Sequence, residues 1–263
     1  MRSALTADLV RLTTLRTTPV YAALLVGACV GPIVLMTLLY DIEYRGPLDA
    51  GDLGKCASIF HVLAVVFAGA TAAGEIRHGA SAVAFLTQRR RWTSLLSHLL
   101  VVAGFLVASY VLGMVLALLA ARCYPDGLAM TGRGWAYLGV YLLIILAWAV
   151  VATALAVLTR SVAGAIAGPL VWMLLLEQLM AMVPMLDPVL HWMPFTAGLD
   201  LAAIVLGEQS GPRDRAIGVP AALVRLFGAA ALAGHPGGDA AGLIPPGAAG
   251  EVHPKAARAR LSS

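Results

Sequence analysis

The amino-acid sequence predicts an all-α polytopic membrane protein, and three observations carry this prediction. First, 60% of the 263 residues are hydrophobic and only 12% are charged, about half the charged fraction of an ordinary soluble domain. Second, long apolar runs recur along the chain, and most approach the roughly 20 residues that cross a bilayer as a helix. Third, the basic residues gather at the ends of those runs, as they do in multi-pass proteins. The net charge of +4 is modest, so no nucleic-acid partner is expected.

Five apolar runs qualify as transmembrane helices by length and composition. They cover residues 19–40, 56–74, 93–121, 135–158 and 162–186. A sixth run, 216–233, is short and carries Arg225 in its middle, and a central arginine costs about 2.5–3.5 kcal/mol on insertion scales. We therefore expect a transmembrane domain over 19–233 that is a bundle of six helices, or of five if the last run fails to insert.

The segments outside these runs differ from one another in character. Residues 1–18 place leucines on one face of a helix and polar residues on the others, which predicts an amphipathic helix in the cytoplasmic interface. Residues 187–212 are too apolar for a free loop and too broken by proline and glycine to cross, so short interfacial or re-entrant helices are expected there. Residues 234–263 are rich in glycine, alanine and proline, a composition typical of a disordered tail.

Loop charge predicts the orientation of the bundle, because arginine and lysine favour the cytoplasmic side. Basic residues dominate segments 1–18, 75–92 and 159–161, whereas loop 41–55 is acidic and loop 122–134 is nearly neutral. Basic and non-basic loops therefore alternate along the chain. We expect a multi-pass protein of the cell membrane with its N-terminus in the cytoplasm.

Three ionisable residues, His61, His98 and Glu177, fall in or near the five long expected transmembrane helices, and His98 could sit at the interface. Ionisable groups within a bilayer are costly, and by default they are functional candidates that face the bundle interior or a water-filled cavity. His61 and Glu177 could serve a proton relay or contact a polar substrate. The alternative is that they pair within the bundle.

No catalytic, metal-binding or nucleotide-binding motif accompanies these residues. The sequence contains no HExxH and no GxSxG, the signatures of metalloproteases and serine hydrolases. Its three cysteines lack the spacing of a metal site. We therefore expect no metal site and no enzymatic activity in this chain, and any ATP that it depends on must be bound by another chain.

Loop 75–92 joins the second and third expected helices and combines charged ends with an apolar centre. The apolar residues of that centre are Ala82, Val83, Phe85 and Leu86. A short helix docked in a groove draws most of its binding energy from a few such side chains. We expect a cytoplasmic helix that presents this apolar centre to a soluble partner, with Glu75 and Arg77 tethering its membrane end.

Four segments together resemble the permease subunits of type 2 ABC exporters. Segment 9–18 (LVRLTTLRTT) is similar to the family's N-terminal elbow helix, and 74–79 (GEIRHG) to its E-x-R-x-G loop opening. Segment 87–91 (TQRRR) is similar to the T-P-x-R-R element that follows, with Gln88 in the place of proline, and 158–165 (LTRSVAGA) to the turn between the fourth and fifth helices. The resemblance covers about residues 3–210, and the weak sixth helix departs from the family pattern.

The resemblance implies a six-helix permease subunit that pairs with a second permease subunit, as a homodimer or heterodimer. It also implies that loop 75–92 is a coupling helix that docks on a cytoplasmic ABC ATPase. ATP and Mg²⁺ would be held by that ATPase, and this chain would bind no cofactor. The expected substrate is a small hydrophobic or amphipathic molecule, such as a drug, an antibiotic or a lipid, that is exported across the cell membrane.

Two other functions stay open on the sequence alone. The chain could be an accessory or immunity membrane protein that works without an ATPase, or, with less support, a polytopic membrane enzyme. The sequence also leaves open the identity of the substrate. It does not decide whether residues 211–263 form a genuine sixth helix and tail or a frameshifted end.

Overall fold

The structure, a computed structural model, is mainly helical in the part of the chain that it describes, with no strand in that part. The described residues are Thr6, Val10, 17–39, 46–77, 92–207 and 213–234. Five of the helices are long and apolar enough to cross a membrane. This confirms the all-α class and indicates a membrane protein.

The first four long helices lie close to the expected transmembrane runs. They are α2 (Thr18–Leu38), α4 (Ala50–Arg77), α6 (Trp92–Ala121) and α7 (Gly132–Thr159). The fifth run, Val162–Ala181, is continuous but irregular. It consists of α8 (Val162–Leu170), the π-helical turn η1 (Val171–Leu176) and α9 (Glu177–Ala181).

Helix α4 begins well before residue 56, where the apolar run starts, because acidic residues cap it. The side chain of Asp49 accepts a hydrogen bond from the backbone N–H of Asp52 at 2.9 Å, and Asp52 accepts one from the N–H of Asp49 at 3.4 Å. This reciprocal pattern is a capping box, which satisfies N–H groups that have no partner within the helix. Lys55 donates to Asp52 at 3.0 Å. The charges of the expected loop 41–55 therefore belong partly to the first turn of a helix.

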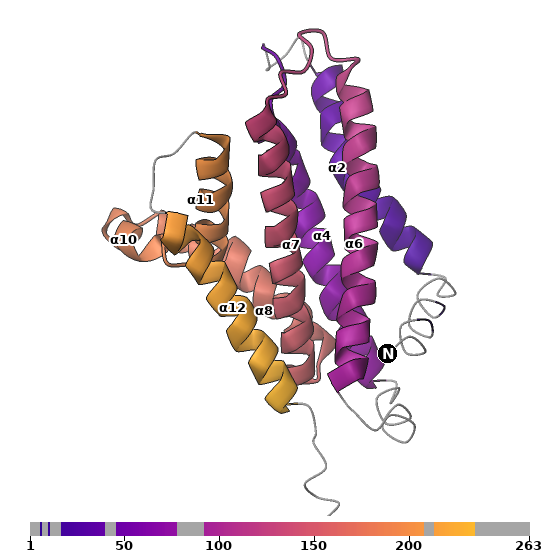
Figure 1. The fold of residues 1–263 in the computed structure, drawn as a ribbon, viewed down its shortest axis with the longest axis vertical. Helices are drawn as coiled ribbons and strands as arrows, with labels where there is room; N and C mark the ends of the chain where they lie inside the picture. The colour runs from indigo at the N-terminus through magenta and orange to yellow at the C-terminus, as the bar shows by residue number, and fades with distance from the viewer. Residues whose placement is uncertain are drawn as a thin grey trace, which may run out of the picture.

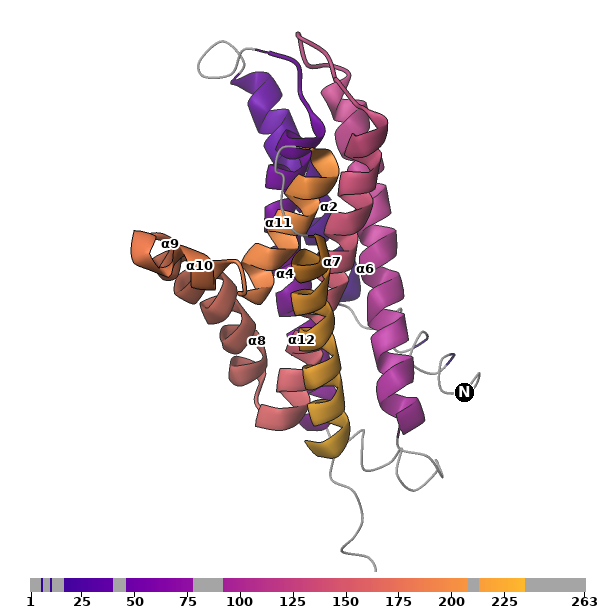
Figure 2. The same ribbon diagram turned by 60° about the vertical axis from the view of Figure 1, so that its left-hand side comes forward.

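Helices α4 and α7 pack against each other at the centre of the bundle, as Figures 1 and 2 show. Helix α2 packs on α4 and α6, and α8 packs on α7 and α4. In the most apolar part of each helix, 61% of the residues are buried in α4 and 56% in α7, against 22% in α2 and 22% in the fifth run. The two central helices therefore form the scaffold on which interior side chains are held.

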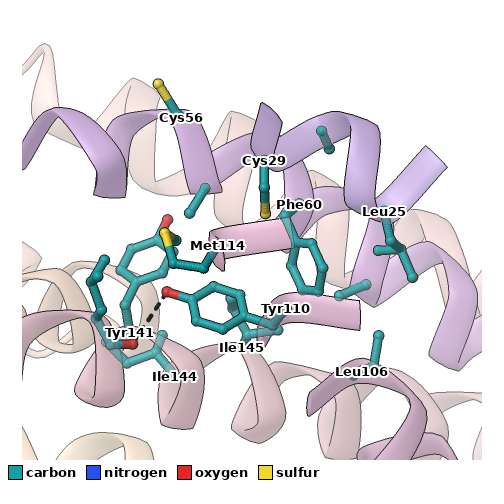
Figure 3. Close-up of a cluster of buried hydrophobic side chains, with 14 of the residues drawn as sticks. Leu25, Cys29, Cys56, Phe60, Leu106, Tyr110, Met114, Tyr141, Ile144 and Ile145 are labelled. Carbon is teal, nitrogen blue, oxygen red and sulfur yellow. Dashed lines mark hydrogen bonds between the residues drawn. The ribbon is translucent and has the colours of Figure 1, made fainter. Parts of the chain in front are cut away.

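Aromatic and aliphatic side chains from α2, α4, α6 and α7 form the main core, part of which Figure 3 shows. The rings of Phe60 and Tyr110 meet edge to face, with 5.3 Å between their centroids. The Tyr110 hydroxyl donates a hydrogen bond to the carbonyl oxygen of Leu138 at 3.2 Å. Cys29 and Cys56 lie buried in the same core as free thiols. This packing fixes α4 against α7.

The loops that precede α4 and α7 meet at one end of the bundle. The N–H of Gly46 donates to the Asp126 carboxyl group at 2.7 Å, and Leu48 exchanges backbone hydrogen bonds with Gly127 and Ala129 at 3.0 and 2.8 Å. Figure 1 places the end of α4, the start of α6 and the α7–α8 turn at the opposite end. The acidic and neutral loops thus share one end, and basic segments share the other. Which end faces the cytoplasm stays a prediction from loop charge.

A tight turn sends the chain from α7 back along it as α8. Arg160 has a left-handed backbone conformation with φ 50°, which ends α7. Ser161 then caps α8 by accepting a hydrogen bond from the N–H of Gly164 at 3.4 Å. The turn directs the fifth run back beside α7 and α4.

The described residues after the fifth run form short helices, and the expected interfacial or re-entrant position of 187–212 stays a prediction. They are η2 (Pro184–Leu186), α10 (Asp187–Leu190) and α11 (Pro194–Leu206). The 13 residues of α11 extend about 20 Å at 1.5 Å per residue, too short to cross a bilayer of roughly 30 Å. Figures 1 and 2 show α9 and α10 projecting sideways from the bundle, while α11 lies against α7.

The expected sixth run forms helix α12 (Arg213–Gly234), which packs against α7 and α11. Its apolar part, Ile217–Ala230, is shorter than a full transmembrane helix. Pro220 lies inside it, and the Arg225 side chain is exposed. Six membrane-crossing helices therefore stay a prediction. Most of the expected interfacial helix (1–18) and of the expected tail (234–263) lies outside the described residues.

The native Cys123 offers a direct test of the orientation. This exposed thiol lies in the α6–α7 loop, at the end of the bundle predicted to face outward. A membrane-impermeant maleimide should label Cys123 in intact cells, and it should label a cysteine introduced at Ser161 only after the membrane is permeabilised. The reverse pattern would invert the topology. Cys29 and Cys56 serve as internal controls because both are buried.

Helix α12 should insert poorly as an isolated segment because of Arg225. Replacing Arg225 with leucine should lower the apparent insertion free energy of 216–233 by about 3 kcal/mol, measured with a glycosylation reporter in a translocon assay. Arg225→Gln, which removes the charge and keeps a polar group, should give a smaller gain. Full insertion of the wild-type segment would contradict this account of the sixth run.

Candidate functional site

Glu177 owes its position to the π-helical turn that precedes it. Pro169 lacks a backbone N–H and interrupts the regular hydrogen bonds of α8 just before η1 begins. In η1 the N–H of Glu177 donates to the carbonyl of Trp172 five residues earlier, which brings these two residues onto one face. The Trp172 indole Nε1–H donates to Glu177 Oε1 at 2.8 Å. In a regular α-helix this spacing would turn the two side chains apart.

The Glu177 carboxyl group, on the fifth run, caps the N-terminus of helix α11. The backbone N–H of Phe195 donates to Oε1 at 3.0 Å, and that of Thr196 donates to Oε2 at 2.7 Å. The Thr196 hydroxyl adds a third hydrogen bond to Oε2 at 2.8 Å. Met193, which precedes α11, makes no side-chain cap. A helix N-terminus carries unpaired N–H groups and a partial positive charge, so an acidic group is favoured there.

Glu177 is only 1% exposed, and donors surround both of its oxygens. Pairing within the bundle, which the sequence left open as the alternative, is the arrangement that these hydrogen bonds show. A carboxyl group with four donors on it is poorly placed to act as a free base. Its immediate role in this conformation is to join the fifth run to α11.

His61 lies on α4 in the interior, where aromatic rings enclose it. Its ring centroid is 6.0 Å from Tyr141 and 6.5 Å from Trp148, both on α7, and 5.7 Å from Phe195 on α11. The side chain is 1% exposed, and neither ring nitrogen has a hydrogen-bond partner among the described residues. Leaving such a buried polar group unpaired costs about 1–3 kcal/mol.

Phe195 connects the two sequence-predicted residues. Its backbone N–H donates to Glu177, and its ring packs on His61 and on Trp148, the latter with 6.2 Å between centroids. The structure thus brings His61 and Glu177 to the two sides of one residue at the start of α11. We call the group of His61, Tyr141, Trp148, Phe195 and Glu177 the interior cluster.

The predicted coupling residues are described only in part. Glu75, in the last turn of α4, places Oε1 3.1 Å from Nδ1 of His98 on α6, so it has a partner within the chain. Arg77 ends α4, and Ala82, Val83, Phe85 and Leu86 lie outside the described residues. The structure therefore describes the helix ends on either side of this loop, and the docking surface stays a prediction.

Sequence reasoning missed the partners of these residues. Trp172, Phe195 and Thr196 carried no signal, because their relation to Glu177 depends on a π-helical turn and on the return of the chain at α11. Two tryptophans, Trp148 and Trp172, sit in the middle of apolar runs rather than at their ends. Trp148 is buried but Trp172 is 40% exposed, so the tendency of buried tryptophan to find a hydrogen-bond partner would not have identified Trp172.

The interior cluster combines hydrogen-bonding groups with aromatic surfaces. Among the described residues, no group of three or more histidine, cysteine, aspartate or glutamate side chains could hold a metal ion. Comparisons with protein-family models, with curated proteins and with solved structures found no match to this chain.

Proposed function

We propose that this chain is the membrane-spanning permease subunit of an ATP-driven exporter of the type 2 ABC class, which moves a small hydrophobic or amphipathic molecule. The observation that carries the proposal is the position of the two helix ends that flank the basic loop 75–92. Helix α4 ends and α6 begins at the end of the bundle that also holds the α7–α8 turn (Figure 1). A cytoplasmic ATPase that bound this loop would act directly on α4.

Helix α4 is suited to transmit such a force. It runs without a break for 28 residues, about 42 Å at 1.5 Å per residue, from the coupling loop to the opposite end of the bundle. It packs on α2, α7 and α8, and it carries His61 at the interior cluster. Movement at Arg77 would therefore reach the interior through one rigid element.

The Glu75–His98 contact supports the same arrangement. It joins α4 to α6 at 3.1 Å, close to the point where both helices enter the coupling loop. Helices α4 and α6 otherwise share few contacts. The contact therefore holds the two ends of the loop at a fixed separation, which would let a docked ATPase move both helices together.

The proposal is tested by purifying the tagged chain from its native membrane in mild detergent. An ABC ATPase encoded near its gene should co-purify in a stoichiometric complex with two copies of a permease subunit, and the ATPase should be recognised by its nucleotide-binding peptides. Recovery of the chain without any ATPase, from a genome region that encodes none, would favour the accessory or immunity function.

A further inference from the structure

The unpaired side chain of His61 is the least explained feature of the interior. The ring of His61 is surrounded by aromatic side chains. An aliphatic residue could occupy the same place without the free-energy cost of burying unpaired polar atoms. Both ring nitrogens lack a partner among the described residues, although imidazole can donate one hydrogen bond and accept another. Buried polar groups in native proteins are almost always paired. His61 therefore has hydrogen-bonding capacity that this conformation does not use.

Phe195 is the one aromatic ring around His61 that does not belong to the central helices. His61, Tyr141 and Trp148 belong to the central helices α4 and α7, whereas Phe195 sits in the first turn of the short helix α11. The start of α11 is fixed through hydrogen bonds to Glu177, which lies on the fifth run. The α9 and α10 segments beyond Glu177 pack mainly on their neighbours in the chain. Helix α11 also packs on α7 and α12, so the Glu177 cap is the contact that fixes its first turn, where Phe195 lies.

We propose that His61, Tyr141 and Trp148 form an occluded binding site in the bundle interior, with Phe195 as its cover and Glu177 as the latch of that cover. The proposal rests on the proposed function for its purpose, since an exporter needs an interior position that binds its substrate and then opens. Breaking the hydrogen bonds to Glu177 frees the start of α11, and the Phe195 ring then leaves His61.

The lining of the site defines the ligand class. Tyr141 and Trp148 present aromatic surfaces, which favour flat aromatic molecules through stacked or edge-to-face contacts. The His61 ring presents its two nitrogens beside them, and one hydrogen-bonding group of a ligand can bind either. The site therefore fits a planar aromatic amphiphile with one hydrogen-bonding group, and it discriminates such a molecule from an analogue that lacks the group.

The latch is tested by the reactivity of a cysteine at position 61, in a chain whose three native cysteines are replaced. The thiolate is the nucleophile that attacks N-ethylmaleimide, and it forms where water reaches the thiol, so labelling reports water at that position. We expect slow labelling of His61→Cys alone and about tenfold faster labelling when Glu177→Gln is added. Thr196→Val, which removes only a hydroxyl donor, should give a smaller increase and guards against misfolding of the Glu177 variant.

A cysteine at Val65, one turn along α4 and also buried, is the matched control. Its labelling by N-ethylmaleimide should stay slow in the native sequence and in the Glu177→Gln and Thr196→Val variants. The proposal would be overturned if His61→Cys were labelled at the same rate with native Glu177 and Thr196 as with either substitution. It would also be overturned if labelling at position 65 rose in parallel, because the substitutions would then loosen the whole bundle rather than uncover His61.

The ligand class is tested with naphthol and naphthalene, titrated by calorimetry into the protein in lipid nanodiscs, with empty nanodiscs subtracted. We expect naphthol to bind about fivefold to tenfold more weakly to His61→Phe than to the native chain, the loss of one hydrogen bond. Naphthalene should bind both alike. Equal naphthol affinities would overturn the assignment. Neither assay contains an ATPase, so failure here leaves the co-purification test of the exporter unaffected.

Discussion

Replacing Glu177 with alanine is expected to lower the free energy of unfolding by about 2–4 kcal/mol. The change removes the acceptor of four hydrogen bonds, from Trp172, from Phe195 and twice from Thr196. Interhelical hydrogen bonds in membrane proteins average about 0.6 kcal/mol each and reach about 1.7, and the cavity and the unpaired donors add to their sum. Unfolding by denaturant in mixed micelles would measure the loss.

Gln178 supplies the matched control for this prediction. It is the next residue in α9 and its side chain is exposed, so Gln178→Ala should change the unfolding free energy by less than about 0.5 kcal/mol. Glu177→Gln keeps one carbonyl acceptor and should fall between the two. We also expect Glu177→Gln to reduce transport more than expression, because the proposed latch would have to open and close during each transport cycle. A Glu177→Ala protein as stable as Gln178→Ala would show that the cap contributes nothing.

Truncating both Phe85 and Leu86 to alanine should uncouple ATP hydrolysis from transport. If these side chains fill a groove on the ATPase, as a docked helix does, their loss removes the contact that transmits movement to α4. We expect transport to fall by at least about tenfold, equivalent to about 1.4 kcal/mol, while the chain still inserts and the ATPase keeps its basal activity. Transport and hydrolysis would be measured together in proteoliposomes.

Replacing one of Arg89, Arg90 or Arg91 with glutamine is the corresponding control. Each basic residue near the headgroups contributes only about 1 kcal/mol to membrane association, and the remaining two should hold the loop at the surface. Transport should therefore stay close to that of the native chain. Unchanged transport in the Phe85 and Leu86 variant would remove these residues from the coupling contact.

The positions of the long helices could be predicted because hydrophobic length is a local property. A bilayer-crossing helix needs about 20 apolar residues whatever its neighbours are, so the five runs appear in the sequence and in the structure. Their ends could be predicted less well. Helix α4 extends back to Ala50 because Asp49 and Asp52 form a capping box, and both residues were counted as loop charges.

The interior cluster could not be assembled from the sequence, although two of its members were singled out. His61 and Glu177 were recognisable because ionisable groups are rare in apolar helices. Their connection depends on η1, which changes the register after Pro169, and on the return of α11 toward the fifth run. Neither feature follows from residue type or helical period, so Phe195 could not be identified as the residue between them.

The most direct test of the ATPase-driven account is photo-crosslinking from position 85 in native membranes. A photo-reactive amino acid placed there should form a covalent adduct with an ABC ATPase, identified by its nucleotide-binding peptides, whereas the same amino acid at Asp126, at the other end of the bundle, should not. Adducts from position 85 with lipid alone, or with no ATPase in cells that transport normally, would contradict the account.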